Sequence, residues 1–306
     1  MHSENHQEWR TAIVTGATGF IGSNVVRLLA ADGWNVHVIV RNASKLTLLK
    51  EVSEYVSIHR HDGSTEQLFE IIKQAAPDIV FHLAAFASVT HRPEDTVSML
   101  QSNIVFSTQL VEAMLANHLY SLINTGTFSQ HWDNKAYSPS SLYDATKQAF
   151  RDILTFYTET TPLKVITLEL YDNYGPGDPR SKIMTLLKRS AADGKPLVMS
   201  PGEQLVDIVY IDDVVDAYIT AAKRLLTIQT VKDEVFAISS GHPIRLRDLV
   251  QVFEQVAGCR LQIEWGGRPY RKREIMIPWN QGEILPNWTA KVSLEEGIGR
   301  FMNISS

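Results

Sequence analysis

The stretch VTGATGFIG, residues 14–22, decides the fold class of this chain. It overlaps the end of an apolar run, TAIVT (11–15), that reads as a strand, and it opens an amphipathic helical stretch. Gly16, Gly19 and Gly22 would permit a tight turn, let the backbone approach a pyrophosphate, and allow helix and strand to pack closely. The phosphate would face a helix N-terminus, where free N–H groups favour an anion. The first glycine spacing is one residue wider than in the commonest dinucleotide fingerprint, so the strand–turn–helix context carries the prediction.

The rest of the first half repeats this alternation of strand and helix. Further strands are predicted at 35–40, 55–59, 78–85, 120–125 and 164–170. Helical stretches separate several of them, around 65–75 and 95–117. Such alternation implies parallel strands joined by right-handed crossovers. The sequence therefore predicts an α/β fold with a Rossmann-like, doubly wound parallel sheet.

After NYGPGDPR (173–180) the regular alternation of strand and helix ends. Helical stretches are interleaved with short strands and Pro/Gly turns, and they lie near 181–193, 213–226 and 245–257. We expect a dinucleotide-binding domain over 1–175 and a smaller C-terminal substrate lobe over 176–306. The chain is expected to cross between the two more than once.

Composition limits the function classes. Hydrophobic residues make up 44% and charged residues 21%, as in soluble globular proteins, and the net charge of -5 argues against a nucleic-acid or anionic-membrane partner. No apolar run is long enough to cross a bilayer, and the polar start of the chain does not resemble a signal peptide. His2 and His6 are read as solvated, and the single Cys259 excludes an intramolecular disulfide or a cysteine-rich metal site. We expect a cytoplasmic protein without a metal.

The end of the second predicted strand indicates the type of dinucleotide. An acidic residue there usually binds the ribose hydroxyls of NAD, whereas an arginine suits the 2′-phosphate of NADP. This chain has VIVRNASK (38–45), with Arg41 and Lys45 and no acid before Glu51. NADP is therefore favoured over NAD. The alternative is that Arg41 is an ordinary surface residue.

The stretch SLYDATKQAF (141–150) carries the candidate catalytic pair. Tyr143 and Lys147 are four residues apart, so both side chains share one face of a helix. A free phenol has a pKa of about 10, and bringing it near 7 needs roughly 4 kcal/mol of phenolate stabilisation. We expect the charge of Lys147 to contribute to this and make Tyr143 a usable acid. The alternative is a surface pair worth a few tenths of a kcal/mol.

The glycine turn together with Tyr-x-x-x-Lys resembles the short-chain dehydrogenase/reductase superfamily. The resemblance is to its extended branch, the nucleoside-diphosphate-sugar epimerases, dehydratases and reductases, and it covers nearly the whole chain. Its further markers are Asp62 in HDGS, HLAA (82–85), Asn103, NTGTF (124–128), YDNYGPGD (171–178) and GEQLVDIVYIDDVVDAY (202–218). These markers occur in the order that the branch has them.

This resemblance implies residue roles. Tyr143 would be the proton donor, with Lys147 beside it and Thr125 hydrogen-bonding the sugar oxygen. Cofactor contacts are expected at Gly16, Thr18, Gly19, Phe20, Ile21, Gly22, Arg41, Asn42, Lys45, Asp62, Gly63, Leu83, Ala84, Ala85, Tyr143 and Lys147. Substrate contacts are expected at Thr127, Asp172, Asn173, Lys182, Gln204, Arg271 and Glu274.

Within the branch, the chain looks most like the 4-ketoreductases that make CDP-linked 3,6-dideoxyhexoses. The pattern GEQ..D...DDVV.AY and the later R..EIM, residues 271–276, carry this likeness. It implies NADPH-dependent reduction of the 4-keto group of a nucleoside-diphosphate 6-deoxy or 3,6-dideoxy hexose. It also implies a homodimer that pairs the helices at 95–117 and 141–159.

Other reactions of the branch fit less well. The 4,6-dehydratases follow the matching threonine with an Asp-Glu pair, but this chain has Gly126 and Thr127. Enzymes that epimerise carbons three and five usually carry a reactive cysteine, and Cys259 lies too far along the chain to match it. Two alternatives stay open: a nucleoside-diphosphate-sugar 4-epimerase with tightly bound NAD, and a non-catalytic NADP-sensing module.

The chain departs from the branch at three substrate positions. Val206 stands where an arginine is frequent, Asp172 replaces an asparagine, and Glu169 replaces an arginine. An added carboxylate near a diphosphate is unfavourable unless a cation answers it. The expected cations are Arg180, Lys182 and Arg271.

Overall fold

The computed structural model describes residues 10–303, so His2 and His6 lie outside the described part. Its centre is a seven-stranded parallel sheet with the strand order β11-β6-β5-β4-β1-β2-β3. The strands are β1 Thr11–Thr15, β2 Asn35–Arg41, β3 Val56–His61, β4 Ile79–His82, β5 Ser121–Thr127, β6 Lys164–Leu170 and β11 Asp233–Ile238. The order reverses at β1, which confirms the predicted doubly wound α/β fold.

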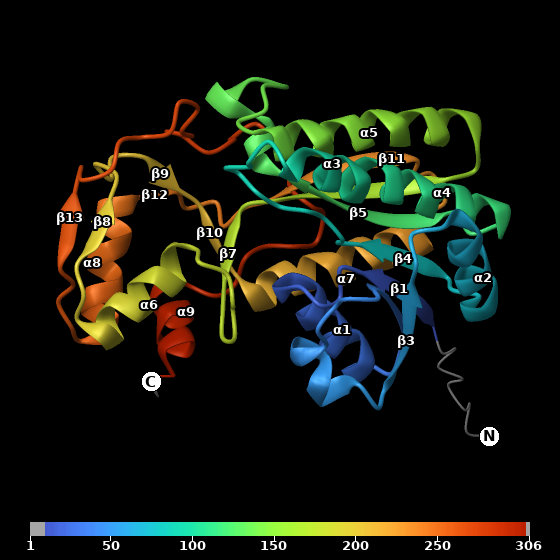
Figure 1. Cartoon of the computed structure of the whole chain (residues 1–306), viewed down its shortest axis with the longest axis horizontal. Coiled ribbons are helices and arrows are strands. Elements are labelled where there is room, and N and C mark those ends of the chain that lie inside the picture. Colours follow the sequence, from blue (N-terminus) through green and yellow to red (C-terminus); the bar gives the residue numbers. More distant parts are fainter. Residues whose placement is uncertain (1–9, 304–306) are drawn as a thin grey trace.

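Helices cover both faces of this sheet (Figure 1). One face carries α1 (Phe20–Ala31) and α7 (Ile211–Thr227), and the other carries α2 (Thr65–Ala75), α4 (Phe106–Ala116) and α5 (Leu142–Thr160). Successive strand residues point to opposite faces, so Ala12 and Val14 join the apolar cluster of the first face while Ile13 joins that of the second. The core is therefore two apolar layers separated by the sheet.

The predicted strand 78–85 is shorter in the structure and ends at His82. Beyond it, the Leu83 amide donates to the Thr15 carbonyl at 3.3 Å and the Ala84 amide donates to Thr15 Oγ1 at 3.2 Å. The segment therefore bends across the end of β1 instead of continuing the ladder.

The predicted helix 95–117 is interrupted by a π-helical turn, Gln101–Val105, between α3 (Asp95–Leu100) and α4. Asn103 sits in this turn, where its side chain bonds both the amide and the carbonyl of Phe86 and donates to Thr146 Oγ1 at 2.9 Å. The wider turn thus lets a buried amide tie the loop after β4 to α5.

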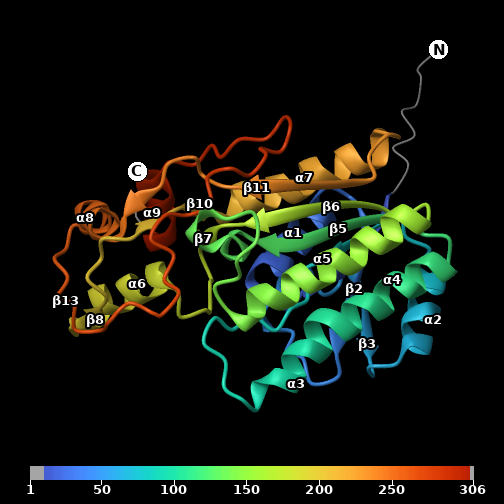
Figure 2. The same cartoon turned by 90° about the horizontal axis from the view of Figure 1, so that it is seen from above.

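A smaller lobe lies beyond the carboxyl ends of the strands (Figure 2). It contains short two-stranded sheets and the helices α6 (Ile183–Asp193), α8 (Leu246–Ala257) and α9 (Leu294–Met302). Its short strands are β7 Asp172–Tyr174, β8 Leu197–Met199, β9 Leu205–Val206, β10 Ile208–Tyr210, β12 Ile244–Arg245 and β13 Ile263–Trp265. Within residues 10–303, no helix combines the length and apolar character needed to cross a membrane.

One helix expected in the smaller lobe belongs elsewhere. The stretch near 213–226 is α7, which packs on α1 and on the large sheet. After α7, β11 pairs with β6 from Asp233↔Val165 to Ile238↔Leu170. The chain therefore leaves the large sheet after β6, enters the smaller lobe, and returns to the large sheet with α7 and β11. The apolar face of α7 is buried by this return.

Candidate active site

The glycine turn after β1 depends on its glycines. Gly16 has a φ of +70°, and a Cβ there would lie 2.5 Å from the Leu83 carbonyl carbon and 2.6 Å from the Ala84 nitrogen. A Cβ at Gly22 would lie 2.3 Å from the Gly16 carbonyl oxygen. The turn therefore brings the Leu83–Ala84 segment against the start of α1, as a close backbone crossing requires.

The start of α1 has the properties of an anion site. Its N-cap is Gly19, whose missing side chain makes no capping hydrogen bond to the first amides of the helix. These amides and the helix dipole suit a phosphate. Thr18 and Ile21 are half-buried beside them, whereas Phe20 is buried.

A cluster of cations surrounds the end of β2. Arg41 is the last residue of that strand and is exposed, as is Lys45. In the described part of the chain, neither forms a salt bridge. Arg60 of β3 donates from Nη1 to the Asn42 carbonyl at 2.7 Å. We did not single out Arg60 from the sequence, although strand pairing places it opposite Val40.

Next to this cluster, Asp62 and Gly63 form the turn after β3. The Asp62 carboxylate accepts hydrogen bonds from the amide and hydroxyl of Ser64, at 2.8 Å and 2.7 Å, and these bonds lower its pKa. Gly63 has a φ of +104° and open space where a side chain would be. The exposed turn leaves room beside the strand ends. Together with the free amides of α1 and the cations after β2, it fits a bound dinucleotide.

Tyr143 and Lys147 lie in the first turns of α5, after the N-cap Ser141. Lys147 is 3% exposed, and burial lowers its pKa to about 8. In the described residues its Nζ forms neither a hydrogen bond nor a salt bridge. Tyr143 is half-buried, and its pKa is raised, first by burial and then by the charge of Asp144. In the protein alone, the pKa shift is the reverse of the one we expected from Lys147.

Thr125 is fully engaged as a donor. Its Oγ1 donates to the His82 carbonyl at 2.9 Å and lies 2.7 Å from the hydroxyl of Tyr218, which is completely buried on α7. Because Thr125 has a single hydroxyl proton, Tyr218 must donate to Thr125. Thr125 can therefore accept a further hydrogen bond, but donating one would require releasing His82. We did not identify Tyr218 as a site residue from the sequence.

A row of buried polar side chains crosses the sheet beside α5. The register aligns Thr15, His82, Asn124 and Thr167 on neighbouring strands. His82 Nδ1 lies 2.8 Å from Thr15 Oγ1, and its Nε2 lies 2.8 Å from the Ser107 hydroxyl. Burial, followed by the charge of Lys147, lowers the pKa of His82 to about 3. This imidazole is therefore neutral and does not compete with Lys147 as a cation.

The predicted substrate residues of the smaller lobe bond mainly to other protein groups. Lys182 pairs with Asp172 at 3.3 Å, and Arg271 binds both oxygens of Glu274, at 3.0 Å and 2.8 Å. Further pairs join Asn173 Oδ1 to Arg180 at 2.8 Å and Gln204 Nε2 to Ser200 at 3.1 Å. Lys182 thus forms an ion pair with the added carboxylate of Asp172, as we predicted.

Glu169 is contacted by other residues than the cations we expected. It is 2% exposed and contacts His131 Nε2 at 3.1 Å and Arg151 Nη1 at 3.5 Å. The prediction that Arg180, Lys182 or Arg271 would neutralise it is wrong, because those residues come from the smaller lobe whereas His131 and Arg151 flank β6. Sequence spacing alone could not identify this contact.

Glu169 also determines what residue 126 can be. A Cβ at Gly126 would lie 3.0 Å from Glu169 Cγ and 3.1 Å from Thr167 Cγ2. A larger side chain at this position, one residue after Thr125, would require the Glu169 and Thr167 side chains to shift. Thr127 follows, and its hydroxyl lies 2.8 Å from that of Ser129.

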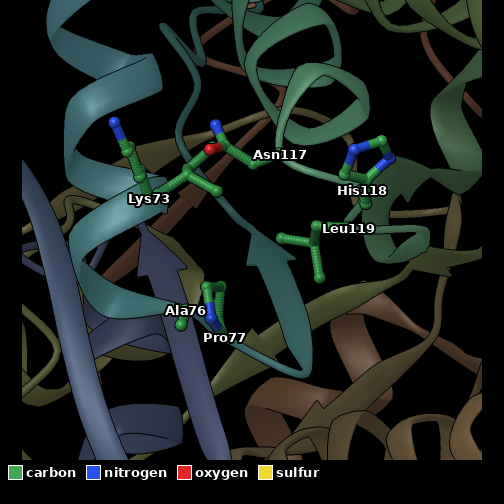
Figure 3. Close-up of a pocket in the computed structure, with 7 residues that line it drawn as sticks. Lys73, Ala76, Pro77, Asn117, His118 and Leu119 are labelled. Atoms are coloured by element: carbon green, nitrogen blue, oxygen red, sulfur yellow. The ribbon is translucent and has the colours of Figure 1, made fainter.

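A cavity of about 310 Å³ lies at the amino ends of the strands, opposite the end of the sheet that carries the candidate active site (Figure 3). Lys73, Ala76, Pro77, Asn117, His118 and Leu119 line it together with Ile72. These residues follow or end α2 and α4 and precede β4 and β5. The cavity therefore belongs to the amino ends of the strands and contains no predicted site residue.

The fold, the glycine turn and the Tyr143–Lys147 pair define an enzyme of the extended short-chain dehydrogenase/reductase class, which uses NAD(P). The model of the NAD dependent epimerase/dehydratase family matches residues 12–236. The chain belongs to this family.

Curated relatives extend the match over almost the whole chain. CDP-abequose synthase from Salmonella muenchen is 25% identical over 297 residues, covering 95% of this chain and 97% of the relative. UDP-glucuronate 4-epimerase from Thermodesulfobacterium geofontis is 27% identical over 315 residues, covering 96% and 95%. The two names share a nucleotide-linked sugar but differ in the reaction.

Solved structures agree with this assignment. UDP-glucose 4-epimerase from Thermotoga maritima, determined with UDP-glucose, superposes with a TM-score of 0.84 at 25% identity. The match covers 96% of this chain and 98% of that one. The similarity includes the smaller lobe as well as the large sheet.

Proposed function

We propose that this protein is an NADPH-dependent 4-ketoreductase of a CDP-linked 6-deoxy or 3,6-dideoxy hexose. The observation that carries the proposal is the Tyr143–Lys147 pair at the start of α5. Lys147 is buried one helical turn from the phenol, and its amine has no protein partner among the described residues. The similarity to CDP-abequose synthase supports the choice of substrate.

NADPH, when bound, supplies the hydride for the ketone carbon. Tyr143 donates its proton to the developing alkoxide oxygen, as general acids do. Lys147 holds the ribose hydroxyls and places a positive charge beside the phenolate that remains. Thr125 accepts a hydrogen bond from a sugar hydroxyl, because its own proton is bound to the His82 carbonyl.

Three observations support NADP as the cofactor. Arg41 and Lys45 are exposed at the end of β2, and the described residues offer neither of them a carboxylate partner. Arg60 is held at the same turn through the Asn42 carbonyl. A guanidinium group binds a phosphate with two parallel hydrogen bonds, which suits the 2′-phosphate of NADP.

The contact between Gly126 and Glu169 argues against a dehydratase. The dehydratases of the branch need a carboxylate directly after the threonine. In this chain that position is a glycine, and a Cβ there would lie in tight contact with the side chains of Glu169 and Thr167. The chemistry that remains is hydride transfer at a single carbon.

A second candidate is a nucleotide-sugar 4-epimerase with tightly bound NAD. The similarity to UDP-glucuronate and UDP-glucose 4-epimerases favours it. The two candidates differ in cofactor exchange, because a reductase must release NADP after each turnover and an epimerase keeps NAD bound.

The deciding experiment is a screen of NADPH oxidation with 4-keto-6-deoxy sugars on CDP, GDP, dTDP and UDP. Stoichiometric oxidation with the CDP sugar, and loss of cofactor on gel filtration, would support the reductase. Retained NAD without NADPH oxidation would favour the epimerase. A Tyr143→Phe variant that binds NADPH but does not turn over would exclude a non-catalytic sensing module.

We also infer a homodimer. Val97, Leu100 and Val105 are exposed apolar residues of the α3–π-turn segment, and Phe156 of α5 is 60% exposed. These helices lie side by side on one face of the molecule in both views (Figures 1 and 2). A second copy placed on this face would bury them. Sedimentation velocity should show a dimer, and Val97→Glu combined with Phe156→Glu should give a monomer.

A further inference from the structure

His82, the last residue of β4, is bonded through both nitrogens of its ring. Nδ1 lies 2.8 Å from Thr15 Oγ1 at the end of β1, and Nε2 lies 2.8 Å from the Ser107 hydroxyl on α4. The ring is completely buried and lies against Phe106 and Phe150, with ring centroids 5.9 Å and 5.6 Å away. A neutral imidazole has one donor and one acceptor, so the two hydroxyls satisfy it completely. The ring is therefore held at both ends.

Thr15 extends this contact to the glycine turn. Its Oγ1 also accepts a hydrogen bond from the Ala84 amide at 3.2 Å, and its carbonyl accepts one from the Leu83 amide at 3.3 Å. The backbone of these two residues lies against Gly16, where an added Cβ would be 2.5 Å from the Leu83 carbonyl carbon. The bond between His82 and Thr15 therefore braces the turn that is expected to hold a pyrophosphate.

The backbone of His82 reaches the catalytic side of the candidate site. Its carbonyl accepts the hydroxyl proton of Thr125 at 2.9 Å. Thr125 belongs to β5 and Thr15 to β1, and β4 lies between these two strands in the sheet. One residue thus joins the turn expected beneath the cofactor to the threonine expected beside the sugar.

We propose that His82 is a positioning residue, which holds the cofactor turn and Thr125 in the spacing that hydride transfer needs. The inference rests on the proposed function, in which the hydride goes to the ketone carbon and the Tyr143 proton to its oxygen. Because the turn is fixed before a nucleotide arrives, binding does not have to order it. Loss of the bond between His82 and Thr15 should therefore weaken nucleotide binding. It should also slow the transfer at saturating nucleotide, because a small displacement of reacting groups lowers the rate.

The test compares Thr15→Val with Ser107→Ala, since each variant removes one buried hydroxyl from the same imidazole. Both should lower the melting temperature, because each leaves a ring nitrogen of His82 without a partner. Only Thr15→Val should raise the dissociation constant of NADPH, by roughly five- to tenfold, since only Thr15 adjoins the glycine turn. Fluorescence titration with NADPH, and with NADH in parallel, measures this without any substrate.

Two further variants separate the hydroxyl and the imidazole from the rest of this packing. Thr15→Ser keeps the hydroxyl and should bind the nucleotide as wild type does. His82→Gln offers an amide that can replace Nε2 but not Nδ1, so it should weaken binding. Adding it to Thr15→Val should have no further effect, because both changes break the same bond.

Equal nucleotide affinities for Thr15→Val and Ser107→Ala would show that His82 serves the core alone and would overturn the inference. Additive losses in the double variant, or a Thr15→Ser protein that binds as poorly as Thr15→Val, would do the same. With a keto sugar and saturating NADPH, kcat should fall in Thr15→Val but not in Ser107→Ala, and an unchanged kcat would overturn the link to Thr125. Weakened nucleotide binding in a protein that reduces no keto sugar would uphold the brace and refute the reductase instead.

Discussion

The phenol oxygen of Tyr218 lies 2.7 Å from Thr125 Oγ1, although 93 residues separate the two in sequence. Tyr218 is fully buried, and burial raises its pKa, so the phenol keeps its proton and donates it to Thr125. The Thr125 proton is in turn directed to the His82 carbonyl. Tyr218 and the His82 carbonyl thus determine which hydrogen bonds Thr125 can make.

Tyr218→Phe should lower kcat without changing NADPH affinity. The variant removes one hydrogen bond to Thr125, and a loss of about 1 kcal/mol corresponds to a roughly fivefold effect. Thr125→Val should also reduce turnover, and adding Tyr218→Phe to it should have no further effect, because Tyr218 acts only through Thr125. Additive losses in this double-mutant cycle would contradict the assignment. Melting temperatures of all three variants serve as the control for folding.

Lys147→Met should stabilise the cofactor-free protein at neutral pH. Burial lowers the pKa of Lys147 to about 8, below its unfolded value of about 10.4, so folding opposes its charge. The unfolded chain then binds more protons, and wild-type stability rises as the pH increases from about 8 towards 10.4. The gain from Lys147→Met is expected to be on the order of 3 kcal/mol at pH 7.

Urea unfolding at about pH 7 and about pH 10 measures this difference. The advantage of Lys147→Met should shrink at the higher pH, because the wild-type lysine is then increasingly neutral in both states. Lys223→Met, at an exposed position on α7, is the matched control and should show no such dependence. A Lys147→Met protein that is less stable than wild type at both pH values would refute the burial penalty.

Replacing Arg41 or Arg60, the cations near the end of β2, should weaken NADPH binding and leave NADH binding unchanged. Charge-assisted hydrogen bonds to a phosphate contribute about 1.5 to 3 kcal/mol, so Arg41→Ala should raise the NADPH Kd roughly tenfold or more. Arg60→Met should have a smaller effect in the same direction, since its guanidinium is also bound to the Asn42 carbonyl. Fluorescence titration with both nucleotides measures this. Equal losses for NADH and NADPH would indicate a damaged turn instead of a lost phosphate contact.

The pair of His131 and Glu169 should stabilise the fold more in acid than in base. Burial tends to lower the pKa of His131, but the hydrogen bond and charge of Glu169 more than offset this and raise it overall. The stabilisation is complete below the unfolded pKa of about 6.5 and is lost as the pH rises through the higher folded value.

His131→Gln should therefore reduce the free energy of unfolding more at about pH 6 than at about pH 8.5. Denaturant unfolding at the two pH values provides the comparison. The exposed His242→Gln is the control and should show the same stability change at both. A larger loss for His131→Gln at the higher pH would contradict a protonated pair.

Local patterns predicted the large sheet and its glycine turn. The strands β1, β2, β5 and β6 lie within a residue or two of their predicted positions, because apolar periodicity is a property of continuous segments. The predicted end of β4 at residue 85 was wrong, because the residues after His82 bend to meet the Gly16 turn. That contact joins segments far apart in the chain, and no local pattern reports it.

The sequence by itself determined the fold class, the family and the positions of Tyr143 and Lys147, since each depends on spacing within a short segment. Only the tertiary structure decided that Tyr218 faces Thr125, that Arg60 joins the end of β2, and that His131 contacts Glu169. It also placed α7 against the large sheet instead of in the smaller lobe. These contacts arise because parallel strands bring distant segments to a common edge, where burial and charge select partners that sequence distance does not reveal.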